Sequence, residues 1–154
     1  MKLSSERILT THVGSLPRPD DLLEMLGKED RGEPVDTVAL HARTAEAVKQ
    51  LVKDQVEAGI DVVSDGEQGK VGYSTYVRHR LTGFEGEGSA TARSDWADFP
   101  EAIARLPRPS TVSRPACDGP IDWKDREAVQ RDIANFKAAV SASPPAEAFM
   151  TAAP

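Results

Sequence analysis

Residues 8–20, ILTTHVGSLPRPD, decide the fold that we expect for this chain. Their first half is apolar and β-branched, which predicts a short buried strand over residues 8–13. Gly14 and Ser15 then interrupt the run, and two prolines stiffen the following loop because each fixes φ and removes a backbone donor. This loop would present the Ser15 hydroxyl and the Arg18 cation at the strand's carboxyl end, where ligands bind in parallel α/β folds. An ordinary strand-to-helix connection would also give this pattern, because Gly-Ser and Pro-x-Pro are common turn sequences.

Two helices are predicted after this loop. The first is short, can be capped by Asp20 or Asp21, and ends at Gly27. The second is predicted over residues 37–58, with Asp36 as its N-cap and an apolar stripe at three- and four-residue steps. That stripe consists of Val38, Ala42, Ala45, Val48, Val52 and Val56.

The pattern then repeats. Residues 60–63 are β-branched, predict a second strand and run into a polar loop. The order of strand, loop, helix, strand and loop indicates a parallel sheet with right-handed crossovers, so both loops would emerge on one side of the sheet. A further helix is predicted over residues 125–141, with Asp122 or Asp125 near its start, and a buried strand over residues 148–153.

Residues 73–120 depart from this alternation, because Arg, Ser, Gly and Pro dominate and aromatic residues are scattered among them. We interpret them as an irregular insertion, with short helices and an irregular strand near residues 111–117, inside one domain over residues 1–154. The predicted strands and crossover helices would leave a strand edge and an apolar face open, whereas a buried parallel strand needs neighbours on both sides. We therefore interpret the chain as the N-terminal part of a larger α/β barrel.

Composition excludes several classes of function. A formal net charge of -6 argues against a nucleic-acid groove. The single cysteine, Cys117, excludes an intrachain disulfide framework and a Cys-x-x-Cys metal site. Neither an apolar signal core nor a membrane span is found, so we expect a cytoplasmic protein without nucleic-acid or membrane partners.

Residues 65–67, Asp-Gly-Glu, stand where the second predicted strand meets its loop. Carboxylates there can bind an ammonium group, orient a thiol or act as a general base. A solvated turn closed by the Asp65 side chain would give the same sequence. Because the loop at Gly14 and Ser15 is expected on the same side, we interpret the two loops as halves of one pocket. His12 could serve there as a general base or metal ligand, or simply as a hydrogen-bonded group at a strand end. No His-x-Cys or His-x-x-x-His pair is present to build a zinc site.

Four segments together resemble the cobalamin-independent methionine synthase family, and within it the short 5-methyltetrahydropteroyltriglutamate–homocysteine methyltransferase-like proteins. They are THVGSLPRP, QVEAGIDVVSDGEQGK, RPACDGPI and EAFMTAAP, in this order along the chain. The resemblance implies an α/β fold of the (β/α)₈ TIM-barrel type, of which this chain would supply the first strands and crossover helices.

The resemblance also implies a reaction, the transfer of a methyl group from 5-methyltetrahydrofolate (polyglutamate) to homocysteine through a zinc-bound thiolate. Zinc would lower the pKa of the thiol, so that a nucleophile exists at neutral pH. Carried over by motif, Ser15 with the backbone at Gly14 would hold the amino-acid carboxylate, and Glu67 would bind its ammonium group. Asp65, which stands where the long-chain enzymes have His, and His12 would line the same pocket.

The family's zinc ligands, a His-x-Cys pair, a Glu and a distant Cys, belong to later strands that are absent from this sequence. The resemblance therefore implies a methyltransferase-type protein, while the residues of this sequence by themselves predict an inactive half-barrel. Two alternatives remain open. The chain could be an inactive remnant, or a half-barrel that a second chain completes. It could also belong to a related zinc-dependent thiol alkyltransferase of the epoxyalkane–coenzyme M type.

Overall fold

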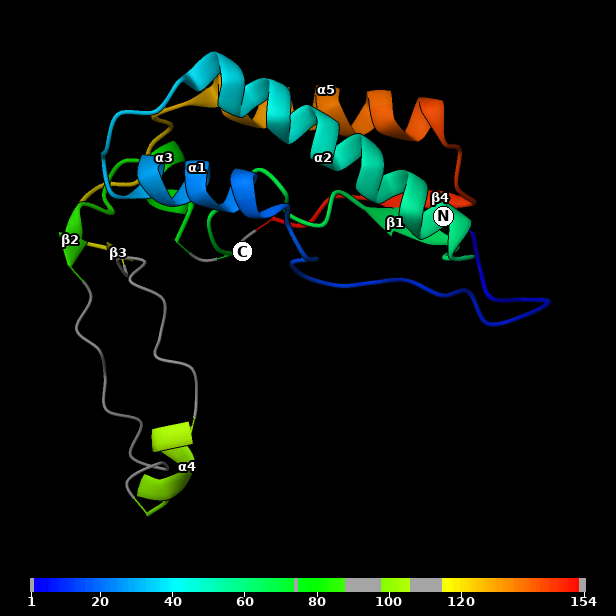
Figure 1. The fold of residues 1–154 in the computed structure, drawn as a ribbon, viewed down its shortest axis with the longest axis horizontal. Helices are drawn as coiled ribbons and strands as arrows, with labels where there is room; N and C mark the ends of the chain where they lie inside the picture. Colours follow the sequence, from blue (N-terminus) through cyan, green and yellow to red (C-terminus); the bar gives the residue numbers. More distant parts are fainter. Residues whose placement is uncertain (1, 74, 88–97, 106–114, 153–154) are drawn as a thin grey trace.

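The computed structural model of the chain describes residues 2–73, 75–87, 98–105 and 115–152, which form a mixed α/β structure (Figure 1). The helices are α1 (Asp20–Asp30), α2 (Thr37–Glu57), α3 (Val77–Arg80), α4 (Pro100–Arg105) and α5 (Arg126–Ala142). The strands are β1 (Val62–Ser64), β2 (Gly86–Glu87), β3 (Pro115–Ala116) and β4 (Glu147–Phe149). No helix in these ranges is both long enough and apolar enough to cross a membrane.

The central sheet is parallel. β1 pairs with β4, with Val62 opposite Glu147 and Ser64 opposite Phe149. The segment before α1 lies along the other edge of β1, through a parallel bridge between Thr11 and Val62. α1 and α2 connect this segment to β1, and α5 connects β1 to β4. The predicted parallel order of strand, helix and strand is therefore confirmed for β1, α5 and β4.

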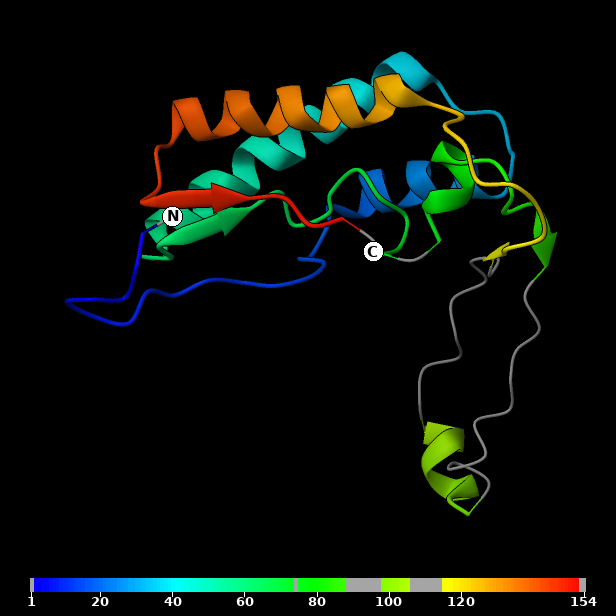
Figure 2. The ribbon, with the colours of Figure 1, turned by 180° about the vertical axis from the view of Figure 1, so that it is seen from behind.

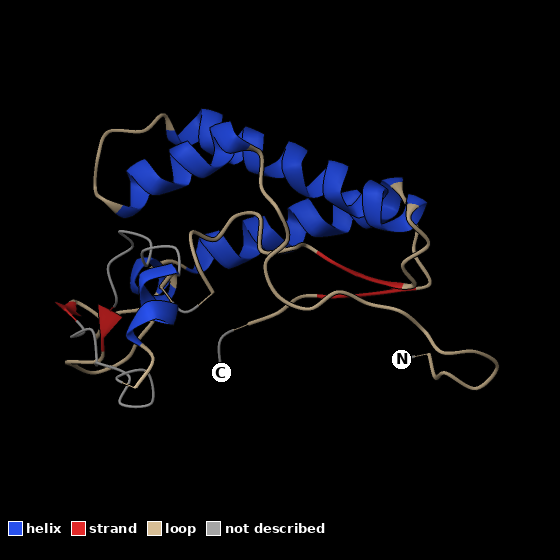
Figure 3. Cartoon of the chain, turned by 60° about the horizontal axis from the view of Figure 1, so that its bottom comes forward, coloured by secondary structure: helices blue, strands red, loops and turns tan. Residues whose placement is uncertain are grey.

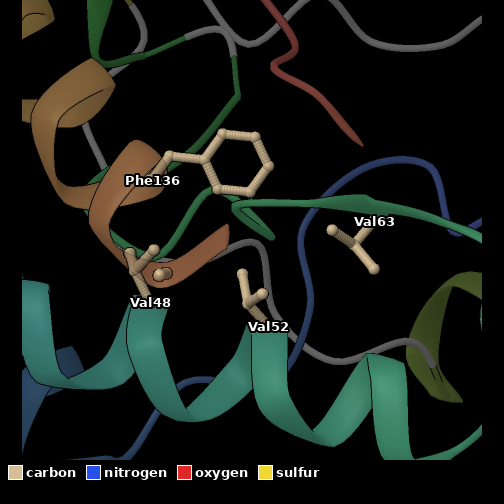
Figure 4. Packing of buried hydrophobic residues seen from close by; sticks show 5 residues of the cluster. Val48, Val52, Val63 and Phe136 are labelled. Atoms are coloured by element: carbon tan, nitrogen blue, oxygen red, sulfur yellow. The ribbon is translucent and has the colours of Figure 1, made fainter. Parts of the chain in front are cut away.

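The two long helices cover the same face of this sheet, as the views in Figures 2 and 3 agree. The main core lies between them and the sheet (Figure 4), and its buried members are Val48, Val52, Val63, Phe136 and Ala139. A second cluster packs α1 against α2 and consists of Leu22, Leu26, Leu40 and Ala47. The fold therefore depends on α2, which contributes to both clusters.

Both long helices begin at an aspartate N-cap. The Asp36 side chain accepts hydrogen bonds from the backbone N–H groups of Val38 and Ala39, each at 3.0 Å. Asp125 accepts from the N–H of Ala128 at 3.0 Å. Each cap satisfies backbone donors that have no partner inside the helix. The predicted starts of α2 and α5 are confirmed.

α1 begins where it was predicted, at Asp20, but its predicted cap and its predicted end are wrong. Asp20 and Asp21 lie in the first turn instead of capping it, and there their negative charges complement the helix dipole. The helix also continues through Gly27 to Asp30. Asp30 is buried and lies 3.0 Å from the His79 Nε2 atom, so a tertiary contact stabilises a last turn that the glycine alone would have ended.

The predicted buried strand over residues 8–13 is also wrong. In this segment only Thr11 forms a bridge to a strand, and the exposed fractions of Ile8 and Val13 are 83% and 79%. Neither core cluster includes these two residues, because the helices cover the sheet at Val63 and not at this edge.

The apolar stripe predicted for α2 is correct only in the second half of the helix. Val48 and Val52 are buried there, whereas Val38 is 78% exposed. In the first half the buried positions include Leu40 and Ala47, which pack against α1 and not against the sheet. The direction of burial therefore changes along the helix, which a single repeated stripe cannot describe.

The predicted final strand is shorter than residues 148–153. β4 ends at Phe149, which is half-buried, and Ala148 is exposed, so a fully buried strand is wrong. Among the described residues β4 pairs along one edge only, with β1.

Residues 153–154 and the predicted strand positions 111–114 lie outside the described residues. The interpretation of residues 73–120 as an insertion stays a prediction; within them β2 and β3 pair antiparallel.

Asp61 joins the first segment to both central strands at the start of β1. Its carboxylate accepts from Arg7 Nη1 at 2.7 Å and from the backbone N–H of Thr10 at 2.9 Å. Its carbonyl accepts from the N–H of Glu147 at 3.1 Å. The Arg7 guanidinium and the Thr10 N–H hold the pKa of Asp61 well below its ordinary value.

Replacing Asp61 with Asn should remove a stabilisation that exists at neutral pH and disappears in acid. The folded-state pKa lies below the unfolded value of about 3.9, so the carboxylate favours folding above that pH and ceases to do so as the pH falls. Urea unfolding at several pH values should give a lower free energy of unfolding for Asp61→Asn than for the wild type at pH 7. This difference should shrink toward pH 2. A deficit that stays constant in acid would contradict this assignment.

Truncation of Phe136 should be costly because it leaves a cavity between α5, α2 and β1. Phe136 is 6% exposed, and Phe136→Ala should lower the free energy of unfolding by about 3–5 kcal/mol. Phe99, which is 63% exposed, offers the matched control, and Phe99→Ala should change stability by less than about 1 kcal/mol. Equal losses for the two variants in urea titrations would show that the core is placed wrongly.

Candidate functional site

The loop after β1 presents a buried carboxylate in an uncommon backbone turn. Gly66 and Glu67 both have φ of 57°, the left-handed region that a residue with a side chain seldom adopts. The side chain of Asp65 closes the turn by accepting the Glu67 N–H at 3.1 Å. Glu67 is 1% exposed. Backbone strain of this kind is concentrated at binding sites, so the turn marks the loop as a candidate site.

This turn is in backbone contact with the loop that precedes α1. Leu16 donates its N–H to the Gly66 carbonyl at 3.0 Å. A Cβ atom at Gly66 would lie 2.2 Å from Leu51 Cδ2 and 3.0 Å from Leu16 Cβ. Gln68 Nε2, also buried, donates to the carbonyl of Pro17 at 3.2 Å. A side chain at this position would overlap Leu51 on α2 and press against Leu16 in the loop before α1, so the packing here favours glycine.

Three segments meet at the side chain of Glu67. The Ser15 hydroxyl donates to Oε2, and the Thr151 hydroxyl donates to Oε1 at 3.1 Å. Arg18 Nη2 donates to the Glu67 backbone carbonyl at 2.8 Å. The prediction that the loops at Ser15 and Glu67 lie at the same end of the sheet is therefore confirmed. Their roles toward a ligand remain predictions.

The third segment, which follows β4, was missed by the sequence analysis. In Figures 1 and 2 it runs beside the loop that follows β1. Lys70 Nζ donates to the Thr151 carbonyl at 2.9 Å, and the Tyr73 hydroxyl donates to the Ala152 carbonyl at 3.3 Å. The sequence offered no signal for it, because Thr151 falls inside the strand predicted over residues 148–153, whereas the observed strand ends at Phe149.

The charges of the site are unevenly paired. Burial raises the pKa of Asp65, although the Glu67 N–H and the Lys70 cation oppose that rise. Burial lowers the pKa of Arg18, whose Nε atom is buried without a hydrogen-bond partner among the described residues. The cations reach backbone carbonyls of the site, and within the described ranges no salt bridge reaches the Glu67 carboxylate. Its two oxygens are bound by neutral hydroxyl groups.

The other predicted site residues lie apart from this carboxylate or serve the turn. His12 is exposed, and its ring makes no hydrogen bond to the part of the chain that the structure describes. Gly14 has φ of 85° and permits the turn before Ser15. Asp65 lies directly beside Glu67, as predicted from the sequence. The structure thus gathers Ser15, Asp65 and Glu67 and leaves His12 outside their hydrogen bonds.

A cavity lies away from Glu67, between α1, α2, α3 and α5. It is a cavity of about 240 Å³ whose lining includes His79, Arg80 and Asp132. Arg80 donates to Asp132 at 2.6 Å, and His79 is held by Asp30 at 3.0 Å. Because these side chains already bond across the helices, we interpret the hollow as part of the packing between the elements.

A methyl group at Gly66 should lower the free energy of unfolding far more than a methyl group at Gly32. Both residues have positive φ, but a Cβ at Gly32 would meet nothing within 4 Å. Gly32→Ala should therefore lose about 1–2 kcal/mol from backbone strain, and Gly66→Ala roughly 1–3 kcal/mol more from overlap with Leu51 and Leu16. Urea unfolding of the two variants measures the difference. Equal losses of unfolding free energy in the two variants would contradict the close contact of Gly66 with Leu51 and Leu16.

Comparison with known proteins supplies the chemical context of this geometry. Residues 8–104 match the family described as cobalamin-independent synthase, catalytic domain. The chain is 36% identical over 89 residues to a methionine synthase of Sulfolobus acidocaldarius, an overlap of 58% of this chain and 25% of that protein. It is 34% identical over 105 residues to a methionine synthase of Saccharolobus islandicus, covering 68% and 29%. The chain thus spans less than a third of the length of these relatives.

A solved structure shows the same fold. It is a B12-independent methionine synthase from Shewanella sp. W3-18-1 in complex with selenomethionine. The similarity has a TM-score of 0.56 at 24% identity and covers 86% of this chain and 35% of that one. The family match includes the loops of both Ser15 and Glu67 and extends over more than half of the sequence. The chain therefore belongs to the cobalamin-independent methionine synthase family and carries part of its catalytic domain.

Proposed function

We propose that this chain forms the amino-acid-binding part of a methyltransferase that transfers a methyl group from 5-methyltetrahydrofolate (polyglutamate) to homocysteine, giving methionine. The observation that carries the proposal is the contact between the Ser15 hydroxyl and the buried Glu67 carboxylate. Family membership supplies the class of reaction. The complex of the Shewanella relative with selenomethionine, an amino acid, supports the class of ligand.

The electrostatics of Glu67 favour a cationic ligand group. Buried charges in proteins are normally paired, because removal of an isolated carboxylate from water is costly. Within the described ranges the Glu67 carboxylate receives hydrogen bonds only from hydroxyl groups. The Arg18 cation attracts its charge but donates to the Glu67 backbone carbonyl, so no cation hydrogen-bonds the carboxylate itself among these residues. The ammonium group of an amino acid would supply that partner through charge-assisted hydrogen bonds. Ser15, whose hydroxyl bonds this carboxylate, is itself exposed.

We also infer that the parallel sheet is a portion of a (β/α)₈ TIM barrel. α2 and α5 lie on one face of β1 and β4, as the outer helices of such a barrel would. Glu67 and Thr151 follow the carboxyl ends of β1 and β4, the end at which these barrels bind their substrates. The open edge of β4 would then pair with the next strand, supplied by the same polypeptide or by a second chain.

The metal of the proposed reaction would be held by another part of the enzyme. No group of three His, Cys, Asp or Glu side chains in the described ranges could bind a metal ion, and Cys117 is exposed. The residues that the structure describes therefore do not fit a zinc site, and we assign them no step on the metal. Their proposed task is to bind and orient the amino acid, in a cytoplasmic protein.

Glu67→Gln should weaken binding of L-homocysteine by about 1.5–3 kcal/mol, because the amide keeps the shape of the side chain but loses its charge. Calorimetric titration of the full-length protein that carries this sequence measures the change. Glu57→Gln, an exposed carboxylate at the end of α2, is the matched control and should leave the affinity unchanged. Unaltered affinity in Glu67→Gln would remove Glu67 from the site.

The same titration separates the alternatives. 2-Mercaptoethanesulfonate carries a thiol and an anion but no ammonium group, so the Glu67 carboxylate should repel it. Binding of this thiol in place of homocysteine would favour an alkyltransferase of the epoxyalkane–coenzyme M type. Binding of neither would favour an inactive remnant.

A further inference from the structure

We propose that Thr151 is a specificity-determining residue, held in place by Lys70, and that it completes with Ser15 and Glu67 a cradle for a primary ammonium group. The inference rests on the proposed function, because it assigns the amino group of the ligand to Glu67. It adds a third loop to a site that sequence motifs place on two loops. It also states which amines the site accepts.

The first observation is the symmetry of the contacts around Glu67. Ser15 donates to one carboxylate oxygen and Thr151 donates to the other, at 3.1 Å. The two hydroxyls come from the segments on either side of β1, since the residue 8–13 segment and β4 flank that strand. The carboxylate is thereby fixed between two neighbouring loops, with its plane set by both.

The second observation concerns hydrogen-bonding capacity. A hydroxyl that donates its proton keeps two acceptor lone pairs, and a carboxylate has about four acceptor sites, of which two are used here. A primary ammonium has three N–H donors. Ser15 Oγ, a Glu67 oxygen and Thr151 Oγ1 can therefore each accept one of them. Because the Ser15 hydroxyl already donates its proton to Glu67, the ligand carboxylate is left to the backbone at Gly14 and not to this hydroxyl. A secondary ammonium, which has two donors and an added methyl group, would leave one acceptor unused.

The third observation is the anchoring of Thr151. Lys70 is buried, and its Nζ atom donates to the Thr151 carbonyl at 2.9 Å while lying 4.9 Å from the centre of the Tyr76 ring. Tyr73 holds the next residue through the Ala152 carbonyl at 3.3 Å. Lys70 follows Glu67 by one turn of the same loop, and its N–H donates to the Glu67 carbonyl at 3.0 Å. Lys70 thus links the loop of Glu67 to the loop of Thr151 and acts as a positioning residue.

The experiment compares two ligands on three forms of the full-length protein. L-Methionine and N-methyl-L-methionine are titrated calorimetrically into the wild type, Thr151→Val and Thr151→Ser. Valine keeps the shape of threonine without the hydroxyl, and serine keeps the hydroxyl. We expect Thr151→Val to weaken L-methionine binding roughly tenfold or more, to weaken N-methyl-L-methionine binding much less, and Thr151→Ser to keep the wild-type preference.

The comparison of the two ligands separates a loss of ammonium recognition from a loss of folded structure. If Thr151 only supports the fold, Thr151→Val will weaken the binding of both ligands by the same factor, and the inference is overturned. If the wild type binds L-methionine and Thr151→Val binds it equally well, this inference fails while the proposed function stands. If the wild type binds neither ligand, the proposed function fails as well.

The positioning role of Lys70 is tested by a double-mutant cycle. Lys70→Met should reduce the preference for L-methionine over its N-methyl form as Thr151→Val does, and the double variant should lose little more. Lys70→Arg, which keeps a cationic donor, should restore part of the preference. If the losses of preference for L-methionine add up in the double variant, Lys70 acts independently of Thr151. Circular dichroism of each variant verifies folding, and the threonine variants decide the matter where Lys70→Met does not fold.

Discussion

The carboxylate of Glu67 is the point on which the functional end of this structure depends. It is almost fully buried, and it is held by hydroxyl groups from the loops on either side of its own. Each contact joins segments far apart in the sequence, because Ser15 precedes α1 and Thr151 follows β4. The left-handed turn at Gly66 and Glu67 brings the side chain to this position. A strained loop and a buried anion are therefore features of one arrangement.

A second carboxylate, at the other end of β1, shows why Glu67 is distinctive. Asp61 also joins three neighbouring segments, through Thr10 on one side and Glu147 on the other. Arg7 neutralises its charge directly. At Glu67 the nearby Arg18 cation donates to the backbone carbonyl, and among the described residues only hydroxyl groups hydrogen-bond the carboxylate. The two ends of the strand are thus fastened in the same way, but among the described residues only the Asp61 carboxylate is hydrogen-bonded by a cation.

Local chemistry made part of this structure predictable. Aspartate caps such as Asp36 identify helix starts because they act on neighbouring backbone donors, and the order of strands and helices predicts that the loops of Ser15 and Glu67 meet. Features that depend on tertiary packing were not predictable. The first half of α2 turns toward α1, residues 8–13 lie at an uncovered edge, and α1 is extended by a contact of Asp30. Thr151 was missed because a hydroxyl after a strand has no sequence signature of its own.

A crystal structure of the full-length protein with L-methionine tests the central claim most directly. Our account predicts that the ammonium nitrogen of the ligand lies within hydrogen-bonding distance of the Glu67 carboxylate, flanked by the hydroxyls of Ser15 and Thr151. A ligand whose ammonium group binds elsewhere, or a lysine or arginine side chain of the complete protein occupying that place beside Glu67, would contradict it.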